Sequence, residues 1–396
     1  MIYRIEVWIA LEKDQTLAGE MICEIGDDGK GRGAFRYASN YLNHPNAFAL
    51  DPVSLPLRAD EFNIDHPGVF GVFEDSLPDD WGRRLLVRKH GILLHQQNLP
   101  NLLLALNASG LGALSYSEQG VPSRTSSETS VLNLGRLVEA VEAFERGDTS
   151  DADINLLLGA GSSPGGARPK ALVYDEGTDT HYLAKFPSVK DNVDVVRIEL
   201  ATMNLAAQAG LSVPELRLVE CGSKPVLLVK RFDITQQGRL HMVSLQTLLK
   251  VSGYYFCQYA DLLNVVRKVS SDPQVDSERL FRQMVFNAVI HNTDDHLKNF
   301  WMVCDEELGW RLSPAFDLVP DIGQKGEHVL FFDFDPLYPG RGKLEKLGLS
   351  WGITGAAAIV EQVFSAIADW RKEFIKCGVM QKDVERFSEI DDYLRR

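Results

Sequence analysis

Residues 279–300 read RLFRQMVFNAVIHNTDDHLKNF, an apolar run followed by a cluster of polar side chains. The apolar spacing of residues 279–288 predicts a buried helix. Residues 291–299 then contain two histidines, two aspartates, two asparagines and a lysine. So many ionisable groups at the end of a buried element are costly unless they bind something. Three interpretations are open: a polar surface loop, a His/Asp metal site, or the catalytic loop of a phosphoryl transferase.

The bulk composition narrows the class of protein. A chain of 396 residues can form two or three packed units. Its net charge of −14 argues against strong nucleic-acid binding by this chain alone, because phosphates attract lysine and arginine. The five cysteines are scattered, as in a reducing cytoplasm, and indicate neither zinc nor disulfides. We expect a cytoplasmic protein that does not enter membranes, because no signal peptide and no apolar run of about 20 residues is present.

The order of predicted elements indicates a two-lobed α+β protein. Residues 1–50 alternate as in a small antiparallel sheet, and the polar stretch 121–130 is the clearest linker. The pattern predicts helices at 77–91 (with Pro78 in the first turn), 134–147 and 193–209, and strands at 112–120, 170–175, 180–187, 214–221, 225–233, 299–304 and 309–316. From about residue 244 helical patterns dominate. We therefore expect a β-rich N-terminal part, a strand-rich part with one long helix, and a mostly helical part, divided as 1–130, 131–234 and 235–396.

A glycine-rich stretch, GAGSSPGGARPK at 159–170, directly precedes a predicted strand. Its backbone N–H groups can point at a phosphate, and Lys170 adds positive charge. The stretch is not a Walker A loop, because Ala167 follows Gly166 where that motif requires lysine. Taken alone, it fits a flexible surface turn equally well.

Lys185, in HYLAKFP at 181–187, follows the glycine-rich stretch on a predicted strand. In kinase-like sites such a lysine holds the nucleotide phosphates and pairs with a helix glutamate, and Glu199 in the next helix is the natural partner. Each residue taken alone also fits an ordinary solvated position.

Asp294 and Asn299 have the D-x-x-x-x-N spacing of a catalytic aspartate and a Mg²⁺-binding asparagine. Asp317, in LSPAFDLVPD at 312–321, follows a short strand and could supply a second metal ligand. Zinc bound by His291, Asp294, Asp295 and His296 is less well supported, because the histidines lack the spacing of helical zinc motifs. The order of all these features favours phosphoryl transfer over the other two interpretations.

With these motifs in this order, the sequence resembles the HipA family of serine/threonine kinases, the toxins of bacterial toxin–antitoxin pairs. The resemblance covers nearly the whole chain. It rests on FEDSLPDDWGRRLL, GALSY, SPGGARPKALV, LAKFP, LLVKRFD, LSPAFDLVPD and, most specifically, NTDDHLKNF.

The resemblance implies a protein-kinase-like core with Asp294 as the catalytic base and Asn299 and Asp317 as Mg²⁺ ligands. It also implies that Ser163 in the glycine-rich loop is autophosphorylated, although Ser162 stands beside it. The implied nucleotide-binding residues are Gly165, Gly166, Ala167, Arg168, Pro169, Lys170, Lys185, Lys230, Arg231, Phe232, His296, Leu297, Lys298, Asn299, Phe316 and Asp317. Among them, residues 230–232 would form the hinge beside the adenine base.

The family also implies partners. These are a small helix-turn-helix antitoxin (HipB-like), operator DNA reached mainly through that antitoxin, and a protein substrate such as an aminoacyl-tRNA synthetase. We therefore expect an ATP- and Mg²⁺-dependent protein serine/threonine kinase that acts as a toxin, inhibits translation and inactivates itself by autophosphorylation. Two alternatives are a small-molecule kinase of the aminoglycoside type and a non-catalytic corepressor bound to the antitoxin.

Overall fold

The computed structural model describes residues 1–11, 14–26, 28–121, 129–159, 168–253, 255–305, 307 and 309–396. Two compact units make up this part of the chain. The first comprises Met1–Val189, Glu220–Val243 and Val303–Glu307, and the second comprises Lys190–Val219, Ser244–Met302 and Leu308–Arg396. The division into parts near residues 130 and 234 stays a prediction.

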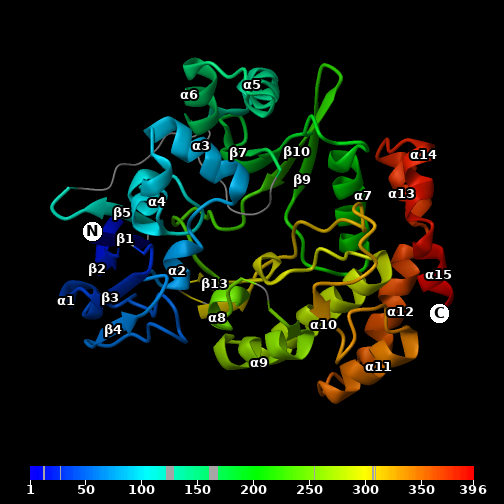
Figure 1. Ribbon diagram of the computed structural model, residues 1–396. Helices are drawn as coiled ribbons and strands as arrows, with labels where there is room; N and C mark the ends of the chain where they lie inside the picture. Colours follow the sequence, from blue (N-terminus) through cyan, green and yellow to red (C-terminus); the bar gives the residue numbers. More distant parts are fainter. Residues whose placement is uncertain are drawn as a thin grey trace. The chain divides into compact units, whose positions relative to one another are not determined.

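The N-terminal part of the first unit contains a five-stranded antiparallel sheet in the order β4-β3-β2-β1-β5 (Figure 1). Its strands are β1 (Ile2–Leu11), β2 (Asp14–Ile25), β3 (Gly31–Tyr37), β4 (Glu61–Ile64) and β5 (Leu114–Glu118). The short helices α1 (Ser39–Leu42) and α2 (Gly71–Glu74), the turn η1 (Leu94–Gln96), and the longer α3 (Asp80–His90) and α4 (Leu99–Leu106) accompany it. The predicted antiparallel sheet is confirmed, because alternating apolar side chains such as Val7 and Ile9 are buried on one face.

Helix α3 begins one turn later than we expected. Asp79 is its N-cap, so Pro78 precedes the helix and does not occupy its first turn. Gly91 ends the helix with a positive φ of 60°, which glycine adopts without a steric penalty. The predicted helix therefore exists, but its first turn was placed wrongly.

A second sheet has the order β6-β7-β8-β10-β9. Its strands are β6 (Thr129–Ser130), β7 (Lys170–Asp175), β8 (Thr180–Lys185), β9 (Leu216–Cys221) and β10 (Lys224–Lys230). The turn η2 (Val131–Asn133) and the helices α5 (Leu134–Arg146) and α6 (Asp151–Gly159) precede β7. Residues 129–130 of the predicted linker form β6 and pair with β7, while residues 122–128 of that linker lie outside the described residues.

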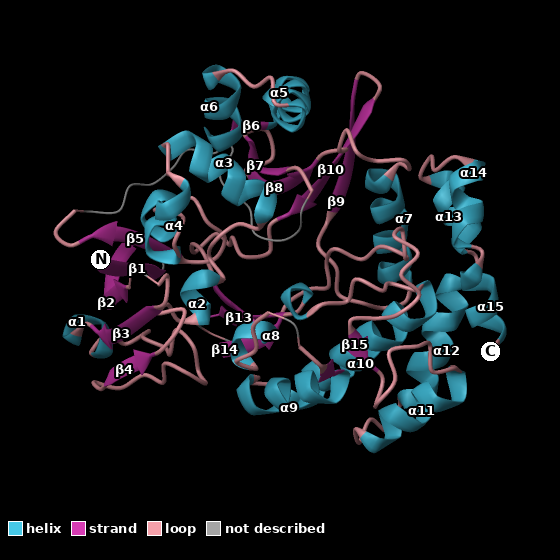
Figure 2. Ribbon diagram, viewed as in Figure 1, coloured by secondary structure: helices cyan, strands magenta, loops and turns pink. Residues whose placement is uncertain are grey.

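The second unit is mostly helical, and Figure 2 shows only short strands between its helices. Its helices are α7 (Val195–Gln208), α8 (Leu245–Leu248), α9 (Tyr259–Val269), α10 (Pro273–Ile290), α11 (Arg341–Ser350), α12 (Ala356–Ile367), α13 (Trp370–Lys376), α14 (Gln381–Val384) and α15 (Glu389–Arg395), with the turns η3 (Leu297–Asn299) and η4 (Glu385–Phe387). The remaining short strands of the chain are β11 (His241–Ser244), β12 (Cys257–Gln258), β13 (Trp301–Asp305), β14 (Gly309–Leu312) and β15 (Leu330–Phe331).

Helix α10 is the centre of the second unit. It packs against α9, α12 and α15, and its side chains from Leu280 to Ile290 are buried with few exceptions. We predicted a buried helix that ends where the polar cluster begins, and this prediction is therefore confirmed. Among the helices that the structure describes, none has the length and hydropathy needed to span a membrane.

Candidate functional site

The polar cluster begins where α10 ends. His291 is the C-cap of α10 in the left-handed conformation (φ 61°, ψ 46°), which histidine adopts much less often than glycine or asparagine. The N–H of Asn292 donates to the carbonyl of Asn287, so the chain turns sharply out of the helix. We call residues 291–299 the polar loop. A backbone in a rarely populated region at the start of a polar loop is common at functional sites.

Asp294 is the exposed aspartate of the polar loop. Its side chain is 55% exposed, and its Oδ1 accepts a hydrogen bond from Lys325 Nζ at 3.0 Å. The backbone N–H of Asp294 donates to Asn292 Oδ1 at 3.3 Å, which ties the main chain at this position to the end of α10. The carboxylate can therefore meet a substrate hydroxyl, while the backbone that carries it is anchored.

Asp295 is fully buried and is held on both oxygens. Its Oδ2 accepts from Tyr259 OH at 2.6 Å and lies 3.1 Å from His328 Nδ1, and its Oδ1 accepts the N–H groups of Val329 (2.9 Å) and Leu330 (3.2 Å). Burial and then the charge of Asp295 raise the pKa of Tyr259 well above its ordinary value, so the phenol stays a donor. Asp295 joins the polar loop to residues 328–330 and has no free oxygen with which to act as a base.

We expect Asp295→Asn to lower the free energy of unfolding by about 1–3 kcal/mol. The substitution replaces one carboxylate oxygen with an amide nitrogen, which cannot accept the hydrogen bonds that this oxygen accepts. Urea denaturation followed by tryptophan fluorescence measures this. Asp333→Asn, at a half-exposed ion pair with Lys343, is the matched control and should change the stability by less than about 1 kcal/mol. Equal losses in the two variants would contradict the assigned role.

Asn299 is buried and oriented by one hydrogen bond. Its Nδ2 donates to the backbone carbonyl of Asp294 at 2.9 Å, which identifies the amide nitrogen and leaves Oδ1 as the acceptor for another group. Asp317, half-buried after β14, has a positive φ of 56°. An amide oxygen and a carboxylate are ligands that Mg²⁺ prefers, so the two side chains fit such an ion chemically.

Three of the four side chains considered for zinc have separate partners. His291 contacts Glu389 (Nδ1–Oε2 3.4 Å) and Tyr393 (Nε2–OH 3.3 Å) on α15, whereas Asp294 and Asp295 have the partners given above. Burial and then His328 lower the pKa of His291, so its ring is neutral near pH 7. Across the part of the chain that the structure describes, no group of three or more His, Cys, Asp and Glu side chains could hold a metal ion.

The other predicted residues of the polar loop differ in exposure. His296 and Lys298 are half-buried, whereas the side chain of Leu297 is fully buried and its N–H donates to Tyr255 OH at 3.0 Å. The carbonyl of Lys298 accepts from Trp301 Nε1 at 2.7 Å. The side chain of Leu297 therefore contributes to the packing of the core. Phe316, beside Asp317, is half-buried.

Two predicted lysines of the first unit lie opposite each other in the second sheet. The register of β7 and β8 pairs Lys170 with Lys185, so both side chains stand on one face of the sheet. Lys170 is only 6% exposed. Two lysines on one face of the sheet can direct donors toward a bound phosphate. Glu199 is buried on α7 of the second unit, and its pairing with Lys185 stays a prediction.

The predicted hinge residues lie where β10 ends, with Lys230 as the last residue of that strand. Lys230 is exposed and Phe232 is half-buried, but the guanidinium of Arg231 is held by Asp233 (Nε–Oδ1 3.0 Å, Nη2–Oδ2 2.7 Å). Asp233 also accepts the N–H of Gly112 at 2.8 Å. Arg231 therefore serves the fold with its side chain, and any contact with an adenine base would come from the backbone of this segment.

The glycine-rich loop is only partly described. Arg168 is half-buried, and the carbonyl of Pro169 accepts the N–H of Phe186 at 3.1 Å, which fixes the start of β7 beside the end of β8. The predicted residues Ser162, Ser163, Gly165, Gly166 and Ala167 lie outside the described residues.

Sequence reasoning missed the side-chain partners of the two aspartates of the polar loop, namely Tyr259, Lys325 and His328. No local motif surrounds them, and they meet the loop only in the folded chain. A buried histidine in the stretch KGEHVLFF was the one available signal, because a histidine inside an apolar segment usually has a polar partner.

Comparison with protein-family models gives two matches. The model of the HipA N-terminal domain matches residues 14–117, and that of the HipA-like C-terminal domain matches residues 162–371, more than half of the chain. The chain belongs to the HipA family. The predicted family is thereby confirmed.

Individual relatives of this chain are named as kinases. A Sinorhizobium fredii protein with the name "Putative kinase Y4mE" is 26% identical over 357 residues, which are 80% of this chain and 81% of that protein. A Haemophilus influenzae protein named "Putative kinase" is 23% identical over 181 residues, 40% of this chain and 52% of that protein.

A solved structure shows the HipA fold directly. It is the Shewanella oneidensis HipA determined with HipB and operator DNA, and it matches with a TM-score of 0.68 at 17% identity over 98% of this chain and 95% of that one. At this identity the likeness concerns the fold, and it confirms the α+β fold class that the order of elements predicted.

Proposed function

We propose that this HipA-family chain is an ATP- and Mg²⁺-dependent protein serine/threonine kinase. The observation that supports this most strongly is the hydrogen bond from Asn299 Nδ2 to the carbonyl of Asp294. It joins an exposed carboxylate and an oriented amide oxygen in one short loop, which is the arrangement that phosphoryl transfer to a hydroxyl requires.

Each group has a role in the proposed reaction. Asp294 orients the substrate hydroxyl and accepts its proton, and Lys325 holds the carboxylate by a hydrogen bond before the substrate arrives. Asn299 Oδ1 and Asp317 would hold Mg²⁺, which supplies neutralisation of phosphate charge when it is bound. The positive face of Lys170 and Lys185 supports binding of the ATP phosphates.

The remaining nucleotide contacts are proposed from the family motifs. Residues 165–170 would cover the phosphates, the backbone of residues 230–232 would lie beside adenine, and residues 296–299 with Phe316 would line the nucleotide. Glu199 would pair with Lys185 and position it.

The proposed biological role is that of a toxin. We propose a small helix-turn-helix antitoxin as the partner, with operator DNA reached through it, by analogy with the Shewanella HipA, which was solved in a complex with HipB and its operator DNA. The substrate class would be a protein of translation such as an aminoacyl-tRNA synthetase. Phosphorylation of Ser163 would place a charge of about −1.5 to −2 in the loop over the ATP phosphates and so inactivate the enzyme.

The experiment is transfer of labelled phosphate from ATP to the purified chain and to a bacterial extract. We expect transfer with Mg²⁺, none with EDTA, and recovery when Mg²⁺ but not Zn²⁺ is restored, because the proposed ligands are oxygens. Mass spectrometry of the labelled chain should locate phosphate on Ser163. Transfer that survives EDTA, or no transfer from ATP under any of these conditions, would refute the proposal.

A further inference from the structure

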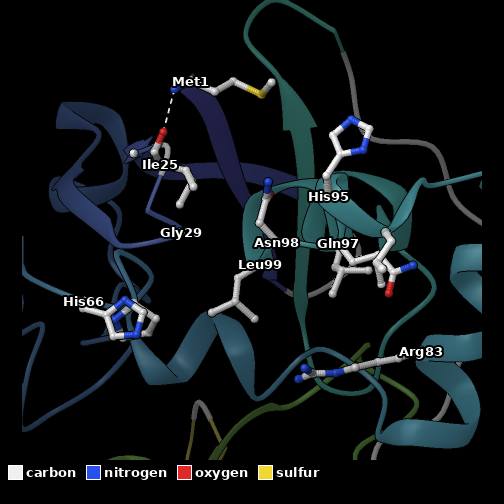
Figure 3. A pocket seen from close by; sticks show the side chains of 13 residues that line it. Met1, Ile25, Gly29, His66, Arg83, His95, Gln97, Asn98 and Leu99 are labelled. Carbon is white, nitrogen blue, oxygen red and sulfur yellow. Dashed lines mark hydrogen bonds between the residues drawn. The ribbon is translucent and has the colours of Figure 1, made fainter.

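The N-terminal part of the first unit contains a pocket of about 500 Å³, far from the polar loop in sequence (Figure 3). The end of β2, the turn at His66, helix α3 and the segment from η1 to α4 line it. Its volume lies in the range of about 300–1,000 Å³ that is usual for small-molecule sites. No role in phosphoryl transfer has been assigned to any of its residues.

One wall is a turn that glycines hold against β3. A Cβ on Gly31 would lie 2.2 Å from the carbonyl oxygen of Pro67, so only glycine allows this approach. The N–H of Gly31 donates to His66 Nδ1 at 3.5 Å. The neutral ring of His66 therefore carries its proton on Nε2, which is a donor available to a ligand.

A second part of the wall carries a positioned arginine. Arg83 Nε donates to the carbonyl of Pro78 at 2.8 Å, and Nη2 donates to Glu74 Oε1 at 3.2 Å. Within the described residues Nη1 has no hydrogen-bond partner. Figure 3 shows the guanidinium extending below Leu99, on the side of the pocket where His66 lies. A guanidinium fixed at two of its nitrogens binds an oxyanion with little further loss of freedom.

The N-terminus of α4 forms a further part of the pocket wall. Asn98 caps the helix by accepting the N–H of Asn101 at 3.1 Å, and its Nδ2 donates to Tyr3 OH at 3.0 Å. These bonds hold the N-terminal turn of α4, and with it the apolar side chains of Leu99 and Leu102, against the pocket. Leu102 is buried at its floor, while Leu94 at the rim is 85% exposed.

The lining combines hydrogen-bond donors with apolar groups. Arg83, which is paired with Glu74, and the imidazoles of His66 and His95 line the pocket together with Leu99 and Leu102, and no Asp or Glu belongs to the described lining. This contrasts with the whole chain, in which 55 acidic residues outnumber 41 lysines and arginines. A cationic group at one wall and leucines at the other match a ligand with an anionic head and an apolar body.

We propose that this pocket binds a small organic anion, a carboxylate or phosphate monoester carried on an apolar body. The oxyanion is held by Arg83 and His66, and the apolar body lies on Leu99 and Leu102 and covers Leu94. This site is independent of the proposed kinase reaction.

Isothermal titration of the full chain with sodium octanoate, octyl phosphate, octylamine and octanol tests the proposal, each below its micelle concentration. We expect saturable one-to-one binding of octanoate or octyl phosphate, and the stronger of these two identifies the head group. Octylamine and octanol should bind at least about tenfold more weakly, since octylamine is a cation without an acceptor and the neutral hydroxyl of octanol forms no ion pair with Arg83.

Variants locate the binding. Arg83→Met should weaken the anion about tenfold or more, since a hydrogen bond to a charged group is lost, whereas Lys89→Met, on the exposed face of the same helix, should leave affinity unchanged. Thermal unfolding shows whether Arg83→Met is folded; if it is not, His66→Ala decides, with an expected loss of about threefold to tenfold. The proposal is overturned if neither anion binds, if octylamine binds as tightly, or if the folded pocket variant binds like the wild type.

Discussion

Replacing Asp294 with asparagine should slow phosphoryl transfer by about 10²–10⁴-fold, because the substrate hydroxyl loses its proton acceptor. Nucleotide affinity should stay within about threefold of the wild type, since the proposed phosphate and metal contacts come from other side chains. Initial rates with labelled ATP and titration with a fluorescent nucleotide measure the two quantities separately.

The matched control is Glu327→Gln, which removes one exposed carboxylate from the segment that also carries Lys325. This variant should keep a rate near that of the wild type. If Asp294→Asn also keeps most of its activity, Asp294 is not the base. Asp295 cannot take over that role without breaking its bonds to Tyr259 and His328.

Replacing Asp233 with alanine should lower the free energy of unfolding by about 3–5 kcal/mol, because it leaves the guanidinium of Arg231 buried without its counter-charge. Both side chains are 3% exposed, and their closest atoms are 2.7 Å apart. The N–H of Gly112 loses its acceptor as well. Chemical denaturation measures the loss.

The control for Asp233 is an exposed pair in the same unit. Asp60→Ala removes a contact of 2.6 Å to Arg58, but both side chains are 61% exposed, so the expected change is about 0–1 kcal/mol. A second variant, Arg231→Met with Asp233→Leu, removes both buried charges and should recover much of the stability. Similar losses for Asp233→Ala and Asp60→Ala would contradict the importance of the buried pair.

The ion pair between Arg231 and Asp233 should also make the stability depend on pH. Burial alone would raise the pKa of the Asp233 carboxyl, but Arg231, through charge and hydrogen bonds, and then Arg239 lower it to about 2. Because the folded pKa lies below the unfolded value of about 3.9, the group contributes about 2–3 kcal/mol at neutral pH. This contribution is lost as the pH falls from about 5 to about 1. The difference in stability between wild type and Asp233→Ala should therefore narrow over that range.

The sequence by itself determined the elements and the family. Apolar residues alternate with period two in residues 2–10, which predicted β1, and a long apolar run before His291 predicted α10. Both patterns are visible in the sequence because a buried face or a buried helix requires apolar residues at regular positions. The motif NTDDHLKNF and the order of the other motifs predicted the HipA family, which the family models confirm. The helices α4 and α6 were missed, and Pro78 was placed in a helix that it precedes.

Only the tertiary structure distinguished residues that are neighbours in the chain. Asp294 and Asp295 differ in the sequence only by one position in their spacing to Asn299, yet one is exposed and the other is bound to His328, 33 positions away. Arg231 reads as part of a hinge, but its partner Asp233 also holds Gly112, 121 positions away. The pocket at Arg83 likewise joins segments from β2 to α4. A side chain's role in these cases depends on which distant groups desolvate it and bond to it, and that follows from packing rather than from spacing along the chain.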